Sequence, residues 1–133
     1  MRFPLTREQV ALQGRVRDLA DREFRERAAR WDEREEYPWE NVKRLVDEGL
    51  MGMTIPGEYG GQGWPILDAI LAVEAVARVC GATARILVDS NLGPVGAIVH
   101  YGTEEQKRKY LPAVIQGDKP AIAITEPRAG SAS

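Results

Sequence analysis

The uneven distribution of charged side chains is the feature that most constrains this chain. Residues 1–48 carry 23 Asp, Glu, Lys or Arg side chains, whereas residues 49–102 carry only six. Because a charged side chain is costly to bury without a partner, residues 49–102 are predicted to form much of the buried part. Apolar residues on both sides of residue 49 recur at three- and four-residue steps, which is the period of a helix. The sequence therefore predicts a mainly α-helical chain with five or six helices.

The first predicted helix has a clear start and one apolar face. Thr6 and Gln9 fit a capping box, and Leu5 and Val10 fit the hydrophobic staple that flanks such a box. The residues expected on the buried face recur with helical spacing: Leu12, Val16, Leu19, Ala20, Phe24, Ala28 and Trp31. The charged residues between positions 22 and 34 include both signs, so they are predicted to form a solvated face.

Two further helices are predicted from their end signals. One begins at Pro38 and stops at Gly49, and the other follows Trp64-Pro65 and runs from residue 66 to residue 80. The predicted buried faces are Trp39, Val42, Leu45 and Val46 in the first, and Ile66, Ile70, Val73, Ala77 and Cys80, widened by Leu67, Leu71 and Val76, in the second. The second helix is so apolar that we expect it to be buried.

The next part of the chain is predicted to be helical and nearly uncharged. Residues 81–83 break the preceding helix, and residues 84–101 continue as a helical region that contains two glycines and a proline. Such small residues let another surface approach, either a neighbouring helix or an acyl chain. A capping box of Thr103 and Gln106 then begins the last helix, which Pro112 is expected to interrupt.

The end of the chain differs from the helical part. Residues 121–125 form a short run with β propensity, and Pro127 cannot donate a hydrogen bond to a strand ladder. The backbone at 129–131 is small enough to approach a ligand closely. We therefore predict a helical domain at 1–117 and the start of a second, β-rich domain at 118–133. From the residues alone, a ligand-binding loop and a plain strand with a turn are equally compatible with this segment.

Composition excludes several classes of protein. A net charge of −2 gives no electrostatic drive toward nucleic acid or an anionic membrane. A single cysteine, Cys80, cannot form an internal disulfide, so the chain suits a reducing, cytoplasmic location. The longest uncharged stretch, residues 90–103, has 14 residues, which is too short to span a bilayer. The first ten residues lack the apolar core of a signal peptide.

Few residues indicate chemistry by themselves. His100 and Cys80 have no partners at metal-ligand spacing, so no metal site is predicted. Asp89 lies in an apolar helix, where a carboxylate must be exposed, paired or used. Residues 56–63 contain four glycines without the pattern G-x-G-x-x-G, which predicts a tight turn rather than a dinucleotide site. The basic residues 107–109 can meet a phosphate, but an exposed helix face is favoured.

Three segments, in this order along the chain, resemble the acyl-CoA dehydrogenase family. They are PGEYGGQG at 56–63, YGTEEQKRKYLP at 101–112 and ITEPRAGS at 124–131. The last is similar to the family's flavin-contacting signature, and the likeness extends from residue 5 to residue 133. The resemblance implies the amino-terminal helical domain of that fold, followed by the first strand of its middle β domain. Full-length members continue through that domain and a carboxy-terminal helical bundle.

The resemblance implies an FAD-dependent enzyme of fatty acid metabolism that desaturates an acyl thioester at its α and β carbons. It also implies an acyl-CoA substrate, an electron-transfer acceptor and a homo-oligomeric full-length enzyme, with the remainder of that enzyme as the partner of this part. The family's catalytic glutamate lies in the carboxy-terminal domain. No catalytic residue is therefore expected here, Glu126 included, and the chain alone is expected to be an inactive fragment.

The resemblance further implies which residues contact ligands. Flavin contacts are expected from Ile122, Ala123, Ile124, Thr125, Glu126, Pro127, Arg128, Ala129, Gly130 and Ser131. Substrate contacts are expected from Ser131 and, on a helix that borders the family's acyl cavity, from Asp89, Ser90 and Gly93. Two positions depart from the family pattern: Arg128 stands where many relatives have glycine, and Ala132 replaces the usual aspartate. Arg128 is expected to change the contacts around the loop, and Ala132 removes a carboxylate that would help to fix it. Flavin binding by the loop is therefore expected but weakened.

Two alternative functions stay open. In the first, the chain is a non-catalytic helical interaction module, which a large exposed apolar patch would mark. In the second, it belongs to a flavin oxidase or monooxygenase, because these enzymes resemble the same fold. Oxygen reactivity of the full-length enzyme distinguishes the second alternative from a dehydrogenase.

Overall fold

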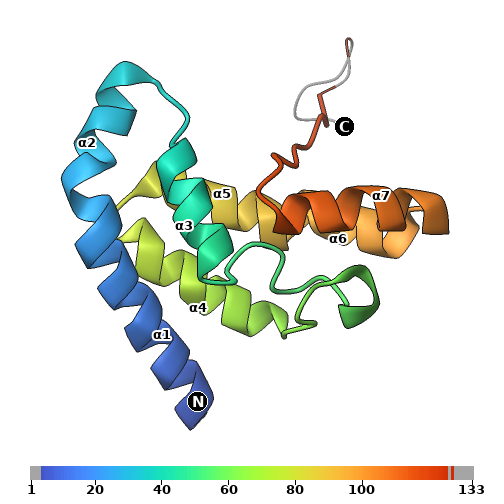
Figure 1. Ribbon diagram of the computed structural model, residues 1–133, viewed down its shortest axis with the longest axis horizontal. Coiled ribbons are helices and arrows are strands. Elements are labelled where there is room, and N and C mark those ends of the chain that lie inside the picture. The colour runs from blue at the N-terminus through green and yellow to red at the C-terminus, as the bar shows by residue number, and fades with distance from the viewer. Residues whose placement is uncertain (1–3, 126, 128–133) are drawn as a thin grey trace.

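The computed structural model describes residues 4–125 and 127 and confirms the mainly α-helical prediction. Its elements, in chain order, are α1 (Arg7–Leu19), the π-helix η1 (Ala20–Phe24), α2 (Arg25–Arg34), α3 (Trp39–Asp47), the 3₁₀ turn η2 (Gly57–Tyr59), α4 (Ile66–Ala77), α5 (Gly81–Asn91), α6 (Gly93–Tyr101) and α7 (Glu104–Ile115). Because α1, η1 and α2 follow one another without a gap, they form one long helix (Figure 1).

The helices pack in two groups that share α5. α4 packs against α1 and α5, and α6 packs against α5 and α7. Figure 1 shows the long α1–α2 helix along one side of the molecule and the pair α6 and α7 at the other. The larger hydrophobic cluster joins α1 through α5, and a smaller one joins Ile55 and Tyr59 to α6 and α7. Within the part of the chain that the structure describes, no helix has the length and apolar character needed to cross a membrane.

The first helix follows the sequence prediction closely. The Thr6 hydroxyl accepts a hydrogen bond from the Gln9 backbone at 3.2 Å, and the Gln9 side chain accepts one from the Thr6 backbone at 3.0 Å, which confirms the capping box. All seven residues of the predicted face are buried or partly buried. Val10 is 55% exposed, and its predicted packing against Leu5 as a hydrophobic staple stays a prediction.

The predicted buried face of α4 is wrong at its amino-terminal end. Ile66, Leu67 and Ile70 are between 47% and 62% exposed. Ala77, also on the predicted face, is exposed as well. Leu71 and Val76 are buried as predicted, and the unpredicted Ala69, Ala72 and Ala75 are buried with them. The physical reason is that α4 lies between α1 and α5, and alanine side chains let neighbouring helices approach closely. Ile66, Leu67 and Ile70 point away from these helices and form an exposed apolar patch, which we call the α4 patch.

Several helix ends and one aromatic side chain also differ from prediction. α4 ends at Ala77 rather than at Cys80, and α5 already begins at Gly81, because Cys80 has an extended backbone that separates the two. α7 continues through Pro112, whose missing N–H leaves only the carbonyl of the exposed Arg108 without its helical partner. Trp39 was predicted to be buried but is 57% exposed.

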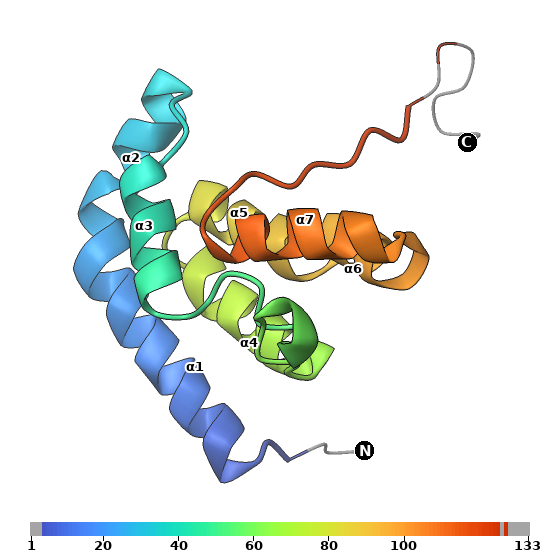
Figure 2. The same cartoon turned by 45° about the vertical axis from the view of Figure 1, so that its right-hand side comes forward.

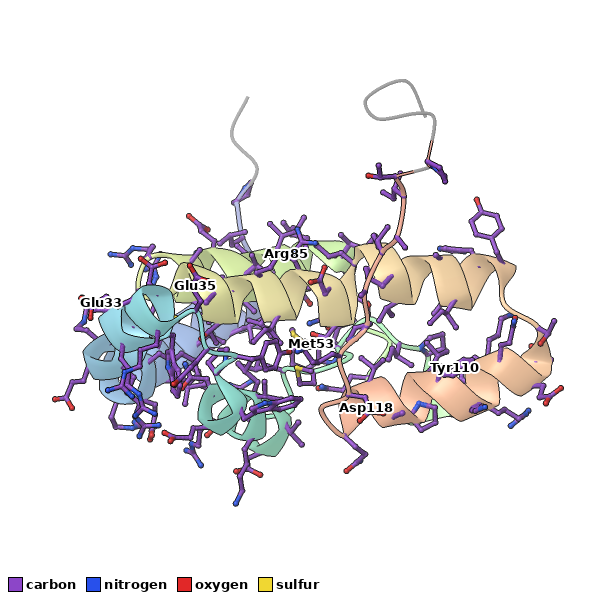
Figure 3. All side chains as sticks on the ribbon, turned by 90° about the horizontal axis from the view of Figure 1, so that it is seen from above. Glu33, Glu35, Met53, Arg85, Tyr110 and Asp118 are labelled. Atoms are coloured by element: carbon purple, nitrogen blue, oxygen red, sulfur yellow. The ribbon has the colours of Figure 1, made fainter. Side chains whose placement is uncertain are left out.

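Residues 50–55 cross the interior without helix and are fixed by Asn91. The Asn91 side chain donates to the Leu50 carbonyl at 2.9 Å and accepts from the Met53 backbone at 2.6 Å. It also donates to the Leu87 carbonyl at 3.0 Å. Met53 is fully buried and lies between the helices in Figure 3. One buried amide thus holds two distant parts of the chain together.

The glycine-rich segment 56–63 is the predicted tight turn. A Cβ atom at Gly61 would lie 2.0 Å from the carbonyl oxygen of Ile55, so no other residue fits there. The Tyr59 hydroxyl lies 3.1 Å from both carboxylate oxygens of Glu104 and so ties the turn to α7.

The segment after α7 leaves the helices, as Figure 2 shows. Residues 121–125 have neither helix nor strand structure, so the expected strand is not formed. A strand requires a second strand for pairing, and the described residues contain none. The proposed domain border after residue 117 stays a prediction.

Replacing Glu35 with glycine is expected to stabilise the fold by about 0.5–1 kcal/mol. Glu35 ends α2 with φ 52° and ψ 32°, a left-handed conformation that costs an L-residue roughly 1–2 kcal/mol and glycine much less, although glycine is less constrained when unfolded. Chemical denaturation followed by circular dichroism measures the change. Glu35→Ala is the control because it keeps the backbone penalty, and equal stabilities of the two variants would contradict the expectation.

Candidate functional site

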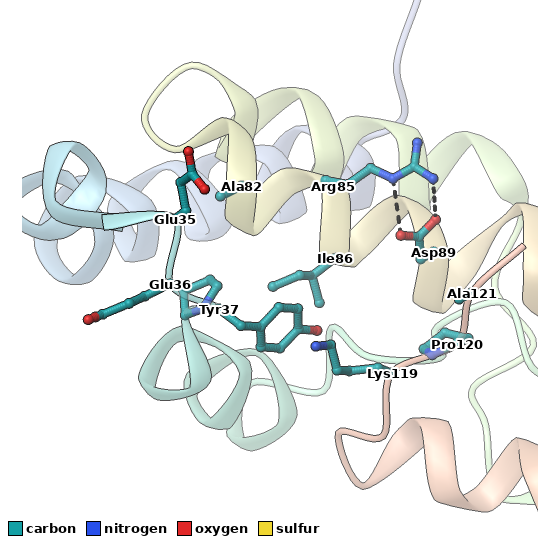
Figure 4. Close-up of a pocket in the computed structure, with 11 residues that line it drawn as sticks. Glu35, Glu36, Tyr37, Ala82, Arg85, Ile86, Asp89, Lys119, Pro120 and Ala121 are labelled. Atoms are coloured by element: carbon teal, nitrogen blue, oxygen red, sulfur yellow. Dashed lines mark hydrogen bonds and ion pairs between the residues drawn. The ribbon is translucent and has the colours of Figure 1, made fainter. Parts of the chain in front are cut away.

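A pocket of about 540 Å³ lies where three segments of the chain meet (Figure 4). The segments are the α2–α3 connection, the outer face of α5 and the chain just after α7. The lining residues are Glu35, Glu36, Tyr37, Pro38, Ala82, Arg85, Ile86, Asp89, Lys119, Pro120 and Ala121. We call it the α5 pocket. It contains one predicted substrate residue, Asp89, and two cationic side chains that the sequence analysis did not select.

Asp89 is paired with Arg85, one helical turn earlier on α5. The Arg85 Nη2 atom lies 2.8 Å from Asp89 Oδ1, and the Nε atom donates to Oδ2 at 3.1 Å. The Arg85 side chain is 67% exposed, whereas that of Asp89 is only 20% exposed. The carboxylate therefore fixes the guanidinium at the pocket while the Arg85 side chain as a whole stays largely exposed. Asp89 uses the Nε and Nη2 side of the guanidinium, so the Nη1 side remains to pair with another anionic group.

Tyr37 forms another wall of the α5 pocket. Burial raises the pKa of the Tyr37 phenol above its ordinary value, and the negative charge of Asp89 adds to the rise. The phenol is therefore protonated at neutral pH. The Lys119 ammonium lies 3.7 Å from the centre of the Tyr37 ring and 5.3 Å from that of Trp39, so the lysine interacts with two aromatic faces.

Two other predicted substrate residues occupy different surroundings. Ser90 is fully buried, and its hydroxyl donates a long hydrogen bond, 3.4 Å, to the Leu87 carbonyl, so it does not line the α5 pocket. Gly93 lies against Ile122: a Cβ atom on Gly93 would be only 2.7 Å from the Ile122 Cδ1 atom. The fold thus brings together one residue expected at the substrate and one expected at the flavin. Their roles stay predictions.

The expected flavin segment is described only in part. Ile122, Ala123, Ile124, Thr125 and Pro127 are exposed, and Glu126, Arg128, Ala129, Gly130 and Ser131 lie outside the described residues. The exposed backbone and the Thr125 hydroxyl fit one wall of a flavin site, since they leave the helices and are accessible to a ring.

The remaining candidates have structural surroundings. Cys80 is buried with its sulfur 3.1 Å from the Thr83 hydroxyl. His100 is exposed beside a second, apolar groove. Lys107 contacts Glu104 at 3.4 Å on the surface of α7. In the described ranges, no cluster of three or more His, Cys, Asp or Glu side chains is placed to hold a metal ion.

Sequence reasoning missed Arg85, Tyr37 and Lys119. Arg85 had a usable signal, because it is one of only two cationic residues between positions 49 and 102 and precedes Asp89 by four positions. Tyr37 and Lys119 are 82 positions apart in the sequence, and nothing in their local patterns indicates that they meet.

Comparison with known proteins was consistent across sequence and structure. A family model described as "Acyl-CoA dehydrogenase, N-terminal domain" matches residues 6–118. A 3-sulfinopropanoyl-CoA desulfinase of Cupriavidus necator is 53% identical over 131 residues, and a short-chain-specific acyl-CoA dehydrogenase of Clostridium acetobutylicum is 44% identical over 134 residues. The structure of butyryl-CoA dehydrogenase from Megasphaera elsdenii superimposes with a TM-score of 0.85 at 30% identity.

These matches cover nearly all of this chain but only part of each relative. The desulfinase alignment includes 98% of the chain and 33% of the relative, the Clostridium alignment 100% and 35%, and the butyryl-CoA dehydrogenase superposition 99% and 36%. The chain spans about a third of the length of the curated relatives that it matches. The match to the family's N-terminal domain covers most of the chain and agrees with its helical fold, so the chain belongs to the acyl-CoA dehydrogenase family.

Proposed function

We propose that this chain is the helical amino-terminal domain of an FAD-dependent enzyme that acts on an acyl-CoA thioester. The family match over residues 6–118 is the observation that carries the proposal. Residues 122–131 would supply one wall of the flavin site, and the catalytic base would come from the part of the enzyme beyond this chain. The flavin supplies an electron acceptor when it is bound. The residues of this chain hold and orient the ligands.

For the reaction, we propose that a short 3-sulfinoacyl-CoA and water give the acyl-CoA and hydrogen sulfite: the C–S bond breaks, the carbon gains a proton and the sulfur gains the hydroxide of water, with no net oxidation or reduction. The support is the higher identity to a relative named as such a desulfinase, 53%, than to one named as a short-chain acyl-CoA dehydrogenase, 44%. The α5 pocket adds a physical argument. A sulfinate is an anion, and the exposed Arg85 guanidinium is a suitable partner for it on the α5 face, where sequence resemblance also places substrate contacts.

The second candidate reaction is α,β-dehydrogenation of an uncharged acyl-CoA. It is supported by the 44% identity to the Clostridium enzyme and by the structural match to butyryl-CoA dehydrogenase. An oxidase or monooxygenase of the same fold would share the same helical domain. The α4 patch fits an interaction module, but it fits equally a surface covered by the remaining two-thirds of the enzyme.

The two reactions give different products and can be measured side by side. Full-length protein, loaded with FAD, is incubated with 3-sulfinopropanoyl-CoA while sulfite release is followed, and with butyryl-CoA plus an artificial electron acceptor while dye bleaching is followed. We expect sulfite release to be the faster reaction. Dye bleaching without sulfite release would favour the dehydrogenase, and hydrogen peroxide formed without the dye would indicate an oxidase.

The isolated 133-residue chain serves as the control in both assays. It offers one wall of a flavin site and lacks a positioned base, which typically contributes about 10²–10⁴-fold to the rate of proton transfer. We therefore expect turnover no faster than that of free flavin. An open reading frame that stops at Ser133, together with turnover by the chain, would overturn the proposed division of the enzyme.

A further inference from the structure

We propose that Lys119 is a positioning residue: held over Tyr37 and Trp39, its ammonium fixes the direction in which the segment 120–125 leaves the helices, and so places the residues expected to contact the flavin. The inference rests on the proposed function for its link to flavin. The contact itself is a property of this chain and can be tested separately.

The aromatic platform under Lys119 is well defined. The Tyr37 and Trp39 rings pack edge to face with their centres 4.6 Å apart. Pro38 stands between them in the sequence, is buried and precedes the first turn of α3. The Lys119 ammonium lies 3.7 Å from the centre of the Tyr37 ring, within the range of a cation–π contact. Figure 4 shows the ammonium end of Lys119 directed at this ring.

The charges around Lys119 do not offer a competing ion pair in the described structure. Three carboxylates line the same pocket, those of Glu35, Glu36 and Asp89. Asp89 is occupied by Arg85, and Glu36 lies 3.7 Å from Arg30 and 3.9 Å from Arg34. Glu35 is exposed at the far end of the pocket. The aromatic faces are therefore the specific partner of the ammonium among the residues described.

The segment that contains Lys119 contacts the helices on either side of this residue. Before it, Gly117 has φ 104°, and its Cα lies so close to α3 that an added Cβ would be 3.1 Å from Val42. After it, the Ile122 side chain covers Gly93 at the start of α6. The segment is thus seated on α3, on the aromatic pair and on α6 in turn. The Asp118 N–H also donates to the Ala113 carbonyl at 3.1 Å, which ties the start of the segment to α7. Lys119 lies between this hydrogen bond and the Ile122 contact.

The test uses a matched pair of lysines in the full-length, FAD-loaded enzyme. Lys119→Met removes the charge and keeps the length of the side chain, whereas Lys119→Arg keeps a cation that can stack on the rings. Lys109→Met is the control, because the Lys109 ammonium lies 5.1 Å from the Tyr110 ring on the surface of α7, away from the segment. FAD affinity is measured by flavin fluorescence, and the flavin geometry by its visible circular dichroism.

We expect Lys119→Met to weaken FAD binding about 3- to 10-fold, as befits a partly exposed cation–π contact, and to change the visible circular dichroism of bound flavin. Lys119→Arg should retain most of the affinity, and Lys109→Met should match the unsubstituted enzyme. Tyr37→Leu should reproduce the effect of Lys119→Met, and the two changes together should add little. Equal affinities of Lys119→Met and Lys109→Met would overturn the proposal.

A second measurement separates this proposal from the proposed function. In the isolated 133-residue chain, backbone ¹⁵N relaxation reports the motion of residues 121–125 without any flavin. We expect faster motion of these residues in Lys119→Met than in Lys109→Met or the unsubstituted chain. Unchanged relaxation would refute the positioning role of Lys119. If the relaxation changes but the full-length protein binds no FAD, the positioning role stands and the flavin assignment fails.

Discussion

Replacing Asn91 with alanine is expected to lower the free energy of unfolding of this chain by about 2–5 kcal/mol. The Asn91 side chain is 2% exposed and joins α5 to the crossing residues, donating to the Leu50 carbonyl and accepting from the Met53 backbone. Alanine leaves both backbone groups without these partners in a dry interior. Each buried polar group that loses its partner costs roughly 1–3 kcal/mol, and the small cavity adds to the loss.

Urea denaturation followed by circular dichroism measures this change. Ser90→Ala is the matched control, because Ser90 is fully buried on the same helix but makes only local contacts, to the Leu87 carbonyl and the Asn91 side chain. We expect Ser90→Ala to cost about 1 kcal/mol or less. If both variants lost the same small amount, the Asn91 bridge would not be the main support of residues 50–55.

Local sequence signals predicted the helix starts well, because the groups that form a cap are close in the sequence. Both capping boxes exist as predicted, at Thr6 and at Thr103. The buried face of α1 was also predictable, since a helix with charges on one side has only one face to bury. α4 is apolar apart from Asp68 and Glu74, so periodicity could not tell which face meets α1 and α5. The choice of its alanine face is made by close packing with elements far away in the sequence.

The candidate site was less predictable than the fold, because its residues come from parts of the chain that are far apart in the sequence. Resemblance indicated Asp89, and the structure places it in a pocket with its partner Arg85. The aromatic platform for Lys119 depends on how α3 and the segment after α7 pack, which no local pattern encodes. The bridge made by Asn91 was missed because a single asparagine in an apolar helix does not show what its amide will contact.

The pairing of Arg85 with Asp89 bears on how the site would treat an anionic substrate. In the structure the carboxylate uses two guanidinium nitrogens of Arg85, and the side chain stays 67% exposed. A sulfinate that approaches from solvent would meet a cation already oriented by the helix. Because Asp89 already fixes the Arg85 guanidinium, little side-chain entropy of Arg85 is lost when an anion binds. A substrate without a negative charge would gain nothing from this arrangement.

Arg85→Ala in the full-length enzyme is therefore expected to lower kcat/KM for 3-sulfinopropanoyl-CoA by about 10- to 150-fold, which corresponds to the loss of one hydrogen-bonded charge partner worth roughly 1.5–3 kcal/mol. With butyryl-CoA and an artificial electron acceptor, the same variant should keep the activity of the unsubstituted enzyme. Arg78→Ala is the matched control, because Arg78 is exposed after the end of α4 and does not line the α5 pocket. The kcat/KM of Arg85→Lys should lie between those of Arg85→Ala and the unsubstituted enzyme, since lysine keeps the charge but not the planar guanidinium.

The loss of the ion pair in Arg85→Ala leaves Asp89 partly buried without its partner, so thermal unfolding is measured on every variant to separate stability from binding. Equal losses with both substrates would mean that Arg85 supports the fold of α5 and does not recognise the anion.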